Sequence, residues 1–141
     1  MNIKIYNKLV RDRIPEIIEA SGAECKTEIL SDEKYLEMID AKLDEELAEY
    51  HKDQNIEELA DLLEVIRAAT IARGYTLEEL EAVRANKAEK RGGFEQKILL
   101  IETIEKWANY KKVNRKMKKS EEKSSLNRKI NQGITKQTTM R

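Results

Sequence analysis

Apolar residues recur every three or four positions along two adjacent stretches of the chain, which is the spacing of one face of an α-helix. In the first stretch the apolar positions are Leu36, Ile39, Leu43, Leu47 and Tyr50. In the second they are Ile56, Leu59, Leu63, Ile66 and Ala69. A polar break at residues 51–55 separates the two stretches. The pattern therefore predicts two helices that fold back on each other as an antiparallel hairpin.

A further helix is predicted on each side of this hairpin. Upstream, Pro15 occupies a first-turn position and predicts a short helix over residues 14–20, which Gly22 ends. Downstream, Thr76 followed three residues later by Glu79 forms a capping box, so another helix begins there. The chain is therefore predicted to be all-α.

The end of the chain has a different composition. We expect the apolar run at residues 98–101 to pack back onto the helical bundle. From about Lys111 apolar residues thin out and polar residues take over, so we expect a helix over about residues 102–119 and disorder beyond it. The predicted organisation is a helical domain at residues 1–101 followed by an extension at residues 102–141.

Size and composition limit the class of protein. A chain of 141 residues can form one domain with a modest core, and 38% charged residues is typical of exposed amphipathic helices. A small core of this kind is often completed by association, so a homodimer or higher homo-oligomer is expected. The single cysteine, Cys25, excludes an intrachain disulfide and indicates a reducing compartment. No signal peptide or membrane span is recognisable, so we expect a cytoplasmic protein without membrane association.

The zero net charge hides an asymmetry between the two predicted parts. Residues 1–101 carry 23 acidic against 15 basic side chains, a net charge of −8. Residues 102–141 carry 4 acidic against 12 basic side chains, a net charge of +8. The two parts therefore call for separate interpretations.

Two pairs of carboxylates flank the predicted turn. Residues three apart share one side of a helix, so Glu46 pairs with Glu49, and Glu58 pairs with Asp61. A hairpin folded about the middle of the break places Glu49 level with Glu58 and Glu46 level with Asp61. Contacting helices lie about 8–10 Å apart, a gap that opposed carboxylates can close. Four converging acidic groups repel unless a cation lies among them, and hard oxygen ligands suit Mg²⁺ or Mn²⁺.

A divalent ion held in this way has open positions for water and phosphate oxygens, polarises a phosphoryl group and lowers the pKa of a bound water. A phosphate substrate also needs cations nearby. The sequence offers two basic sets as candidate phosphate-binding residues, namely Lys8, Arg11 and Arg13, and Lys87, Lys90 and Arg91. Lys87 and Arg91 are four apart and share a helix side, so they are the better candidates in the second set. Glu45 lies about 100° from Glu46 around the helix, so it is a candidate either for a group that supports the metal ligands from behind or for a base that orients water.

Other interpretations remain open at this point. Acidic pairs at helical spacing are usually solvated faces, and each cation of the first basic set has about equal chances of a salt bridge and a phosphate contact. The alternative function is a non-catalytic helical adaptor or nucleotide-binding protein whose basic tail contacts nucleic acid. The tail lacks interleaved aromatic residues, so we favour a solvated extension and do not expect nucleic-acid binding.

The acidic motif, Glu45-Glu46-x-x-Glu49 followed by Glu58-x-x-Asp61, resembles the signature of the all-α nucleoside triphosphate pyrophosphohydrolases. This MazG-like superfamily includes dimeric dUTPases and phosphoribosyl-ATP pyrophosphohydrolase. The stretches at residues 6–15 and 87–94 are similar to a small branch described as phosphoribosyl-ATP pyrophosphohydrolase-like. The resemblance covers about residues 1–101. The eight-residue gap between the acidic pairs is short for the superfamily, and the tail after Ile101 has no counterpart in it.

The resemblance implies a MazG-like helical bundle, built on the antiparallel hairpin, that hydrolyses a nucleoside triphosphate to the monophosphate and pyrophosphate. It also implies dependence on Mg²⁺, with Mn²⁺ as an alternative. By this similarity the metal ligands are Glu46, Glu49, Glu58 and Asp61. The nucleotide stays open among phosphoribosyl-ATP, a damaged or non-standard nucleotide and a common deoxynucleotide, because base selectivity depends on the shape of a pocket made by several helices.

Overall fold

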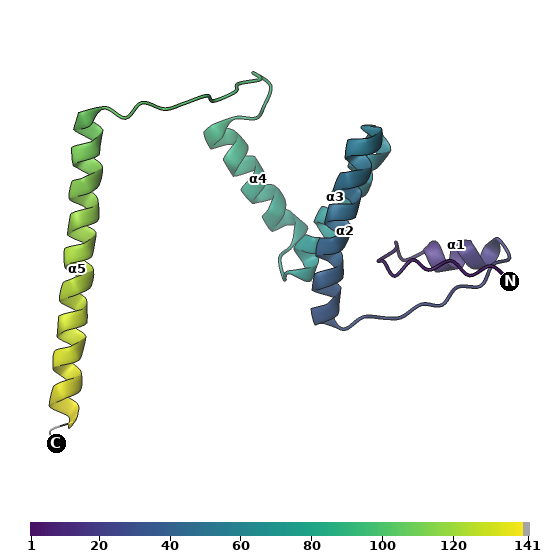
Figure 1. Ribbon diagram of the computed structural model, residues 1–141, viewed down its shortest axis with the longest axis horizontal. Coiled ribbons are helices and arrows are strands. Elements are labelled where there is room, and N and C mark those ends of the chain that lie inside the picture. Colours follow the sequence, from purple (N-terminus) through teal and green to yellow (C-terminus); the bar gives the residue numbers. More distant parts are fainter. Residues whose placement is uncertain (140–141) are drawn as a thin grey trace. The chain divides into compact units, whose positions relative to one another are not determined.

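The computed structural model describes the backbone of residues 1–139 and the side chains of that range except those of residues 108–110 and 134–139. All regular elements in this range are α-helices, and none of its residues lies in a strand (Figure 1). The all-α prediction is confirmed. The chain divides into two compact units, Met1–Gly93 and Phe94–Arg141.

The first unit is built on an antiparallel hairpin of α2 (Asp32–Asp53) and α3 (Ile56–Ala72), which lie side by side. Its core is small. Among the described residues the buried hydrophobic side chains are Ile39 on α2, 4% exposed, and Val65 on α3, 8% exposed. The apolar periodicity thus predicts the two helices correctly, but the hairpin alone buries few of the apolar side chains.

The connection between α2 and α3 is shorter than expected. The break predicted at residues 51–55 is wrong, because α2 continues to Asp53 and leaves only Gln54 and Asn55 between the helices. Basic side chains in the last turn of α2 favour this continuation by interacting with the helix dipole. Gln54 then adopts a left-handed conformation (φ +50°) and its N–H donates to the Tyr50 carbonyl over 2.8 Å. The Asn55 side chain accepts from the Glu58 N–H over 3.0 Å and caps α3.

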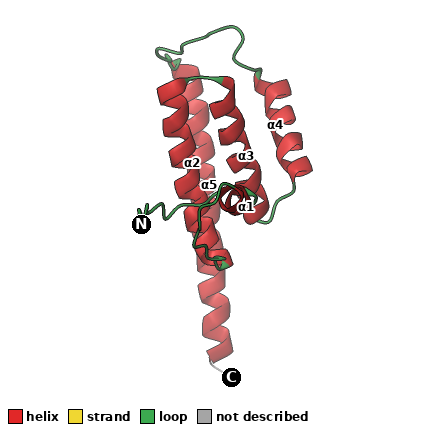
Figure 2. Cartoon of the chain, turned by 90° about the vertical axis from the view of Figure 1, so that its right-hand side faces the viewer, coloured by secondary structure: helices red, strands yellow, loops and turns green. Residues whose placement is uncertain are grey.

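Two shorter helices complete the first unit. Helix α1 (Ile14–Ala20) has the predicted limits. Helix α4 (Leu77–Arg91) begins as expected, with the Thr76 hydroxyl accepting from the Glu79 N–H over 3.1 Å. Figure 2 shows α2, α3 and α4 in that order, and α4 diverges from α3 along its length in Figure 1.

The second unit begins with an irregular apolar segment. Residues 94–106 contain no regular element, and the run from Ile98 to Ile101 is 75–85% exposed. The expectation that this run packs onto the bundle stays a prediction. The second unit also begins at Phe94, whereas the sequence placed the extension after Ile101.

Helix α5 (Trp107–Thr139) is much longer than the helix expected over residues 102–119. The expected disorder beyond residue 119 is wrong up to residue 139, and residues 140–141 of the extension lie outside the described residues. Lys, Arg and Glu are good helix formers and α5 contains no proline, so the backbone stays helical without a strong apolar face. None of the described helices is long and apolar enough to cross a membrane.

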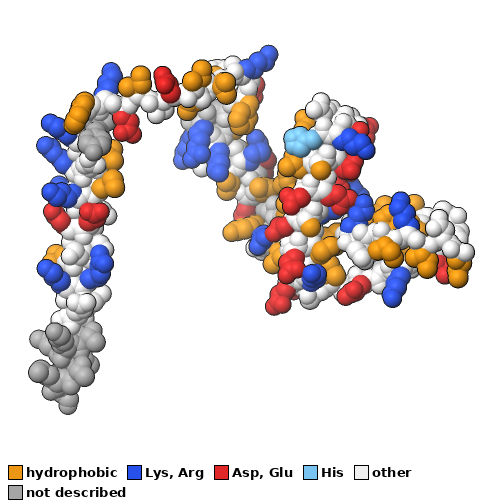
Figure 3. All heavy atoms as spheres, in the orientation of Figure 1, with side chains coloured by type: hydrophobic (Ala, Val, Ile, Leu, Met, Phe, Trp, Pro, Cys, Tyr) orange, Lys and Arg blue, Asp and Glu red, His pale blue; other side chains and the backbone are white. Residues whose placement is uncertain are grey.

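The charge asymmetry is visible on the surface. Figure 3 shows acidic side chains along α2 and basic side chains along α5. The candidate chemistry lies in the first unit, because all the predicted site residues belong to it.

Candidate metal centre

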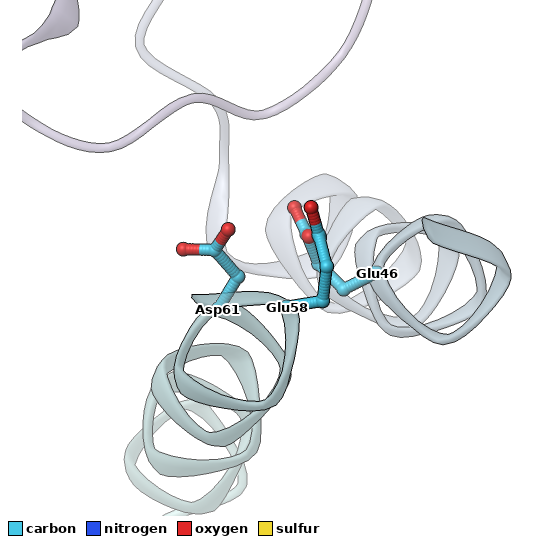
Figure 4. Close-up of side chains that lie close together, drawn as sticks. All are labelled: Glu46, Glu58 and Asp61. Carbon is cyan, nitrogen blue, oxygen red and sulfur yellow. The ribbon is translucent and has the colours of Figure 1, made fainter. Parts of the chain in front are cut away.

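Three carboxylates from the two hairpin helices come together. One oxygen from each of Glu46, Glu58 and Asp61 lies within 4.8 Å of the other two. In Figure 4, Glu46 of α2 and Glu58 of α3 extend in the same direction, and Asp61 lies beside Glu58 one turn further along α3. Glu46 is buried and the other two are half-buried. The hairpin therefore concentrates negative charge at one level.

A second group of carboxylates shares one member with the first. Glu49, Asp53 and Glu58 also offer oxygens within 4.8 Å of one another. Glu49 thus lies level with Glu58 and Glu46 with Asp61, as the fold-back geometry predicts. The four predicted ligands do not form a single group, however, because Glu58 alone belongs to both groups. Their role as metal ligands stays a prediction.

Sequence reasoning missed two members of this cluster. Asp53 was assigned to the turn, although it follows Glu49 by four residues and shares its side of α2 once the helix is extended. Lys42 is 15% exposed, and its ammonium lies 3.0 Å from Glu46 and 3.3 Å from Glu45. The spacing of Lys42, three and four residues before these glutamates, is a signal that could have found it.

The N-terminal segment brings further cations to the hairpin. Lys8 donates to Glu45 over 2.8 Å, and Arg11 donates to Asp61 over 2.6 Å. Lys8 and Arg11 therefore form salt bridges in the structure. Their partners lie in or next to the carboxylate cluster. Arg13 lies away from the cluster and pairs with Glu16 at 3.6 Å.

The second basic set is not brought to the carboxylates. Lys87 and Arg91 lie on α4, which contacts α3 and then diverges from it. Neither residue forms an ion pair with any described residue. A contact between these two residues and substrate phosphate stays a prediction.

Glu58 lies among carboxylates whose negative charge is not balanced by nearby cations of the described residues. Burial raises the pKa of Glu58, and repulsion from Asp61, Glu49, Asp53 and Glu46 raises it further. Among the described residues no cation pairs with Glu58. The cluster thus holds five carboxylates, Glu58 included, and among the described residues only two cations pair with it, on Glu46 and Asp61.

Glu45 has the opposite electrostatic character. Burial is the largest influence and would raise the pKa of Glu45, but the hydrogen bonds and charges of Lys8 and Lys42 together outweigh it and lower that pKa. The same hydrogen bond to Glu45 raises the pKa of Lys8 against the opposing effect of burial. Glu45 is therefore a paired, persistently ionised carboxylate beside the metal candidates.

The donor set fits a small hard cation. Octahedral Mg²⁺ binds oxygen at about 2.0–2.1 Å, so neighbouring ligands lie about 3 Å apart and opposite ligands about 4 Å apart. The oxygens of Glu46, Glu58 and Asp61 reach this arrangement with small side-chain movements from their present separations. Lys42 and Arg11 each contact one oxygen of their carboxylate, and a carboxylate has a second oxygen to offer.

The pKa of Glu58 predicts how stability depends on pH without divalent cations. Because that pKa is raised in the folded protein, the stabilisation from protonated Glu58 is fully present below the ordinary glutamate pKa and is lost as pH rises through the raised value. Glu58→Gln should therefore exceed the wild type in unfolding free energy at pH 7, and the difference should vanish as pH falls below the ordinary value. Urea unfolding in EDTA from pH 7 to about pH 4 measures this difference. A difference that grows on acidification would contradict it.

Comparisons with known proteins add little to this geometry. No family model matches the chain, and no solved structure matches it. A protein of Mycolicibacterium smegmatis named "Uncharacterized protein" is 60% identical to the chain over 42 residues. These residues make up 30% of this chain and 43% of that protein, so the match spans less than half of the relative.

Proposed function

We propose that the protein is a Mg²⁺-dependent nucleotide pyrophosphohydrolase, which cleaves a nucleoside triphosphate or a phosphoribosyl-ATP-like nucleotide to the monophosphate and pyrophosphate. The observation that supports it best is the position of Glu58, a carboxylate that belongs to both acidic groups and has no ion pair with a described residue. The resemblance of the acidic motif to the MazG-like pyrophosphohydrolases points to the same chemistry.

In this proposal Glu46, Glu58 and Asp61 hold the cation, and Glu49 and Asp53 extend the acidic site on the other side of Glu58. Bound Mg²⁺ would supply charge neutralisation for the phosphates and a more acidic water. The carboxylates fix the direction from which the polyphosphate approaches, because their oxygens converge on one level of the hairpin.

The cations of the N-terminal segment bind the phosphates. Arg11 presents a guanidinium at the edge of the cluster, and this planar group is suited to bidentate contact with phosphate. Lys8 pairs with Glu45, the neighbour of Glu46 in the sequence. Both are about half exposed, so each retains donors for a ligand while it pairs with its carboxylate.

Glu45 has a positioning role in this proposal. Its lowered pKa makes it a weak proton acceptor, so we assign it to hold Lys8 and Lys42 in place. Glu49 is the better candidate base, because it adjoins Glu58 and has no ion pair with a described residue.

A panel of nucleotides tests the proposal. The full chain is incubated with each common nucleoside triphosphate, deoxynucleoside triphosphate, oxidised nucleotide and phosphoribosyl-ATP, with Mg²⁺, with Mn²⁺ or with EDTA. We expect at least one of them to give the monophosphate and pyrophosphate in a metal-dependent reaction. Failure of every nucleotide to release pyrophosphate would favour the non-catalytic adaptor.

Removal of the tail provides a test of the domain organisation. All the proposed site residues lie in Met1–Gly93, so deletion of residues 111–141 should leave the rate of hydrolysis within about twofold of the full chain. Product formation by the truncated and full chains under identical conditions measures this ratio. Loss of activity, with the helical circular dichroism of the first unit retained, would assign the tail a part in the reaction.

A further inference from the structure

The N-terminal segment, residues 1–13, is joined to the hairpin by ion pairs between side chains. Its residues are exposed apart from half-buried Leu9, and among the described residues no backbone hydrogen bond links the segment to α2 or α3. Lys8 contacts Glu45 of α2 over 2.8 Å, and Arg11 contacts Asp61 of α3 over 2.6 Å. The attachment of the segment to the hairpin therefore depends on these two pairs of charges.

The two ion pairs differ in the carboxylate that they use. Glu45, the partner of Lys8, belongs to neither group of converging carboxylates. Asp61 belongs to the group of three, and among the described residues Arg11 is its only ion-pair partner. Arg11 is thus the cation of the N-terminal segment that shares a carboxylate with the candidate metal centre.

The backbone of Arg11 is held independently of its side chain. Its carbonyl accepts from the Ile14 N–H over 3.0 Å, in the turn that leads into α1. Its side chain is 56% exposed, and arginine has several rotatable bonds between the backbone and the guanidinium. The guanidinium can therefore leave Asp61 while the backbone of Arg11 stays in place.

We propose that Arg11 is an exchangeable cation, which pairs with Asp61 in the metal-free protein and is loosened from it when Mg²⁺ binds the same carboxylate. This inference rests on the proposed function, because it takes the Mg²⁺ of that proposal as given. The second oxygen of Asp61 allows the ion to bind while Arg11 is still paired. The guanidinium and a divalent ion then share one negative charge and repel each other, so each weakens the other's hold on Asp61.

Loosening Arg11 makes its donors available beside the carboxylate cluster. Lys8 keeps its partner, because Glu45 is outside both carboxylate groups, so the segment stays on the hairpin while Arg11 changes partner. Phosphate that reaches the cluster brings new negative charge, with which a planar guanidinium can form two parallel hydrogen bonds. A nucleotide therefore gains the full contact with Arg11 only where the metal ion is already bound.

Isothermal titration calorimetry of the full chain with magnesium chloride alone tests the coupling. Linkage is reciprocal, so an ion that weakens the pair of Arg11 with Asp61 is itself bound more weakly because of that pair. We expect Arg11→Gln to bind Mg²⁺ about two- to fivefold more tightly than the wild type, as for the loss of one partly exposed ion pair. Arg13→Gln is the matched control, because Arg13 pairs with Glu16 away from the cluster, and it should keep the wild-type affinity.

Chemical modification of arginine tests the same coupling without a substitution at Arg11. Phenylglyoxal reacts with guanidinium groups, and mass spectrometry of the digested protein gives the rate at each arginine. We expect Mg²⁺ to raise the rate at Arg11 at least about twofold and to leave the rate at Arg13 unchanged. Glu58→Gln, which lacks one of the proposed ligands, should show no such rise at Arg11.

The outcomes separate this inference from the proposed function. If the wild type binds Mg²⁺ but Arg11→Gln binds it no more tightly, Arg11 does not exchange and the metal centre is unaffected. An equal effect of Mg²⁺ on the modification of Arg11 and Arg13, or no effect on either, would also overturn the inference alone. A wild-type protein that binds no Mg²⁺ would overturn the inference and the metal centre together.

Discussion

Glu58→Gln is expected to lower Mg²⁺-dependent nucleotide hydrolysis at least about 100-fold, because loss of a metal ligand costs more than loss of the groups that support one. Glu58 offers an oxygen to both carboxylate groups, so neutralising it weakens both. The same change should raise the unfolding free energy of the metal-free protein at pH 7, since it removes the burial of a charge and the repulsion that together raise the pKa of Glu58. Steady-state kinetics and urea unfolding measure the two effects.

Glu57→Gln is the matched control for this variant. Glu57 is exposed on the first turn of α3, one residue before Glu58, and belongs to neither carboxylate group. Its substitution makes the same chemical change and should leave hydrolysis within about twofold of the wild type. Mg²⁺ should raise the melting temperature of the wild type and of Glu57→Gln, but not that of Glu58→Gln. A folded and fully active Glu58→Gln protein would rule out the proposed metal centre.

Ile39→Ala is expected to lower the unfolding free energy by about 2–3 kcal/mol, in the lower part of the range for an isoleucine truncated in a core. Ile39 is the most buried hydrophobic side chain among the described residues and contributes to the small core of the α2–α3 hairpin. Such a loss is a large fraction of the roughly 5–15 kcal/mol that stabilises an ordinary domain. Urea unfolding followed by far-ultraviolet circular dichroism measures the change.

Ile29→Ala controls for the change of residue type. Ile29 precedes α2 and is 95% exposed, so its truncation should change the unfolding free energy by less than about 0.5 kcal/mol. Equal effects of the two substitutions would mean that α2 and α3 do not form the core described above.

The helices of the first unit follow from local signals in the sequence. The Thr76 cap, the Pro15 start and the apolar periodicity of α2 and α3 act within one or two turns, so a single sequence reveals them. The turn was predicted too long because residues 51–53 are polar. A polar side chain indicates that a residue is exposed to solvent. It does not distinguish the exposed end of a helix from a loop, because both are polar.

Local spacing in the sequence also predicts part of the candidate site. Equal spacing about the turn relates Glu49 to Glu58 and Glu46 to Asp61 without knowledge of the fold. The ion pair of Arg11 with Asp61 joins residues 50 positions apart, and no local pattern encodes such a pair. Local spacing does contain the signals for Lys42 and Asp53, but both lie four residues from their acidic neighbours, and a search for carboxylate pairs three residues apart does not find them.

The second unit was predicted least well. Helix α5 has weak apolar periodicity, so a prediction based on buried apolar residues ends it near residue 119. Intrinsic propensity extends it, because its residues favour a helix even in full contact with water.

The length of the two-residue connection at Gln54 and Asn55 determines both which side chains of α3 join the carboxylate cluster and which are buried. One inserted residue would rotate α3 by about 100° against α2. Glu57 and Ala60 would then take the places of Glu58 and Asp61, and Glu64 would take the buried place of Val65. A single lengthening of the loop would thus remove a carboxylate from the cluster and bury a charge at once, so homologues that keep this cluster should tolerate substitutions here far better than insertions or deletions.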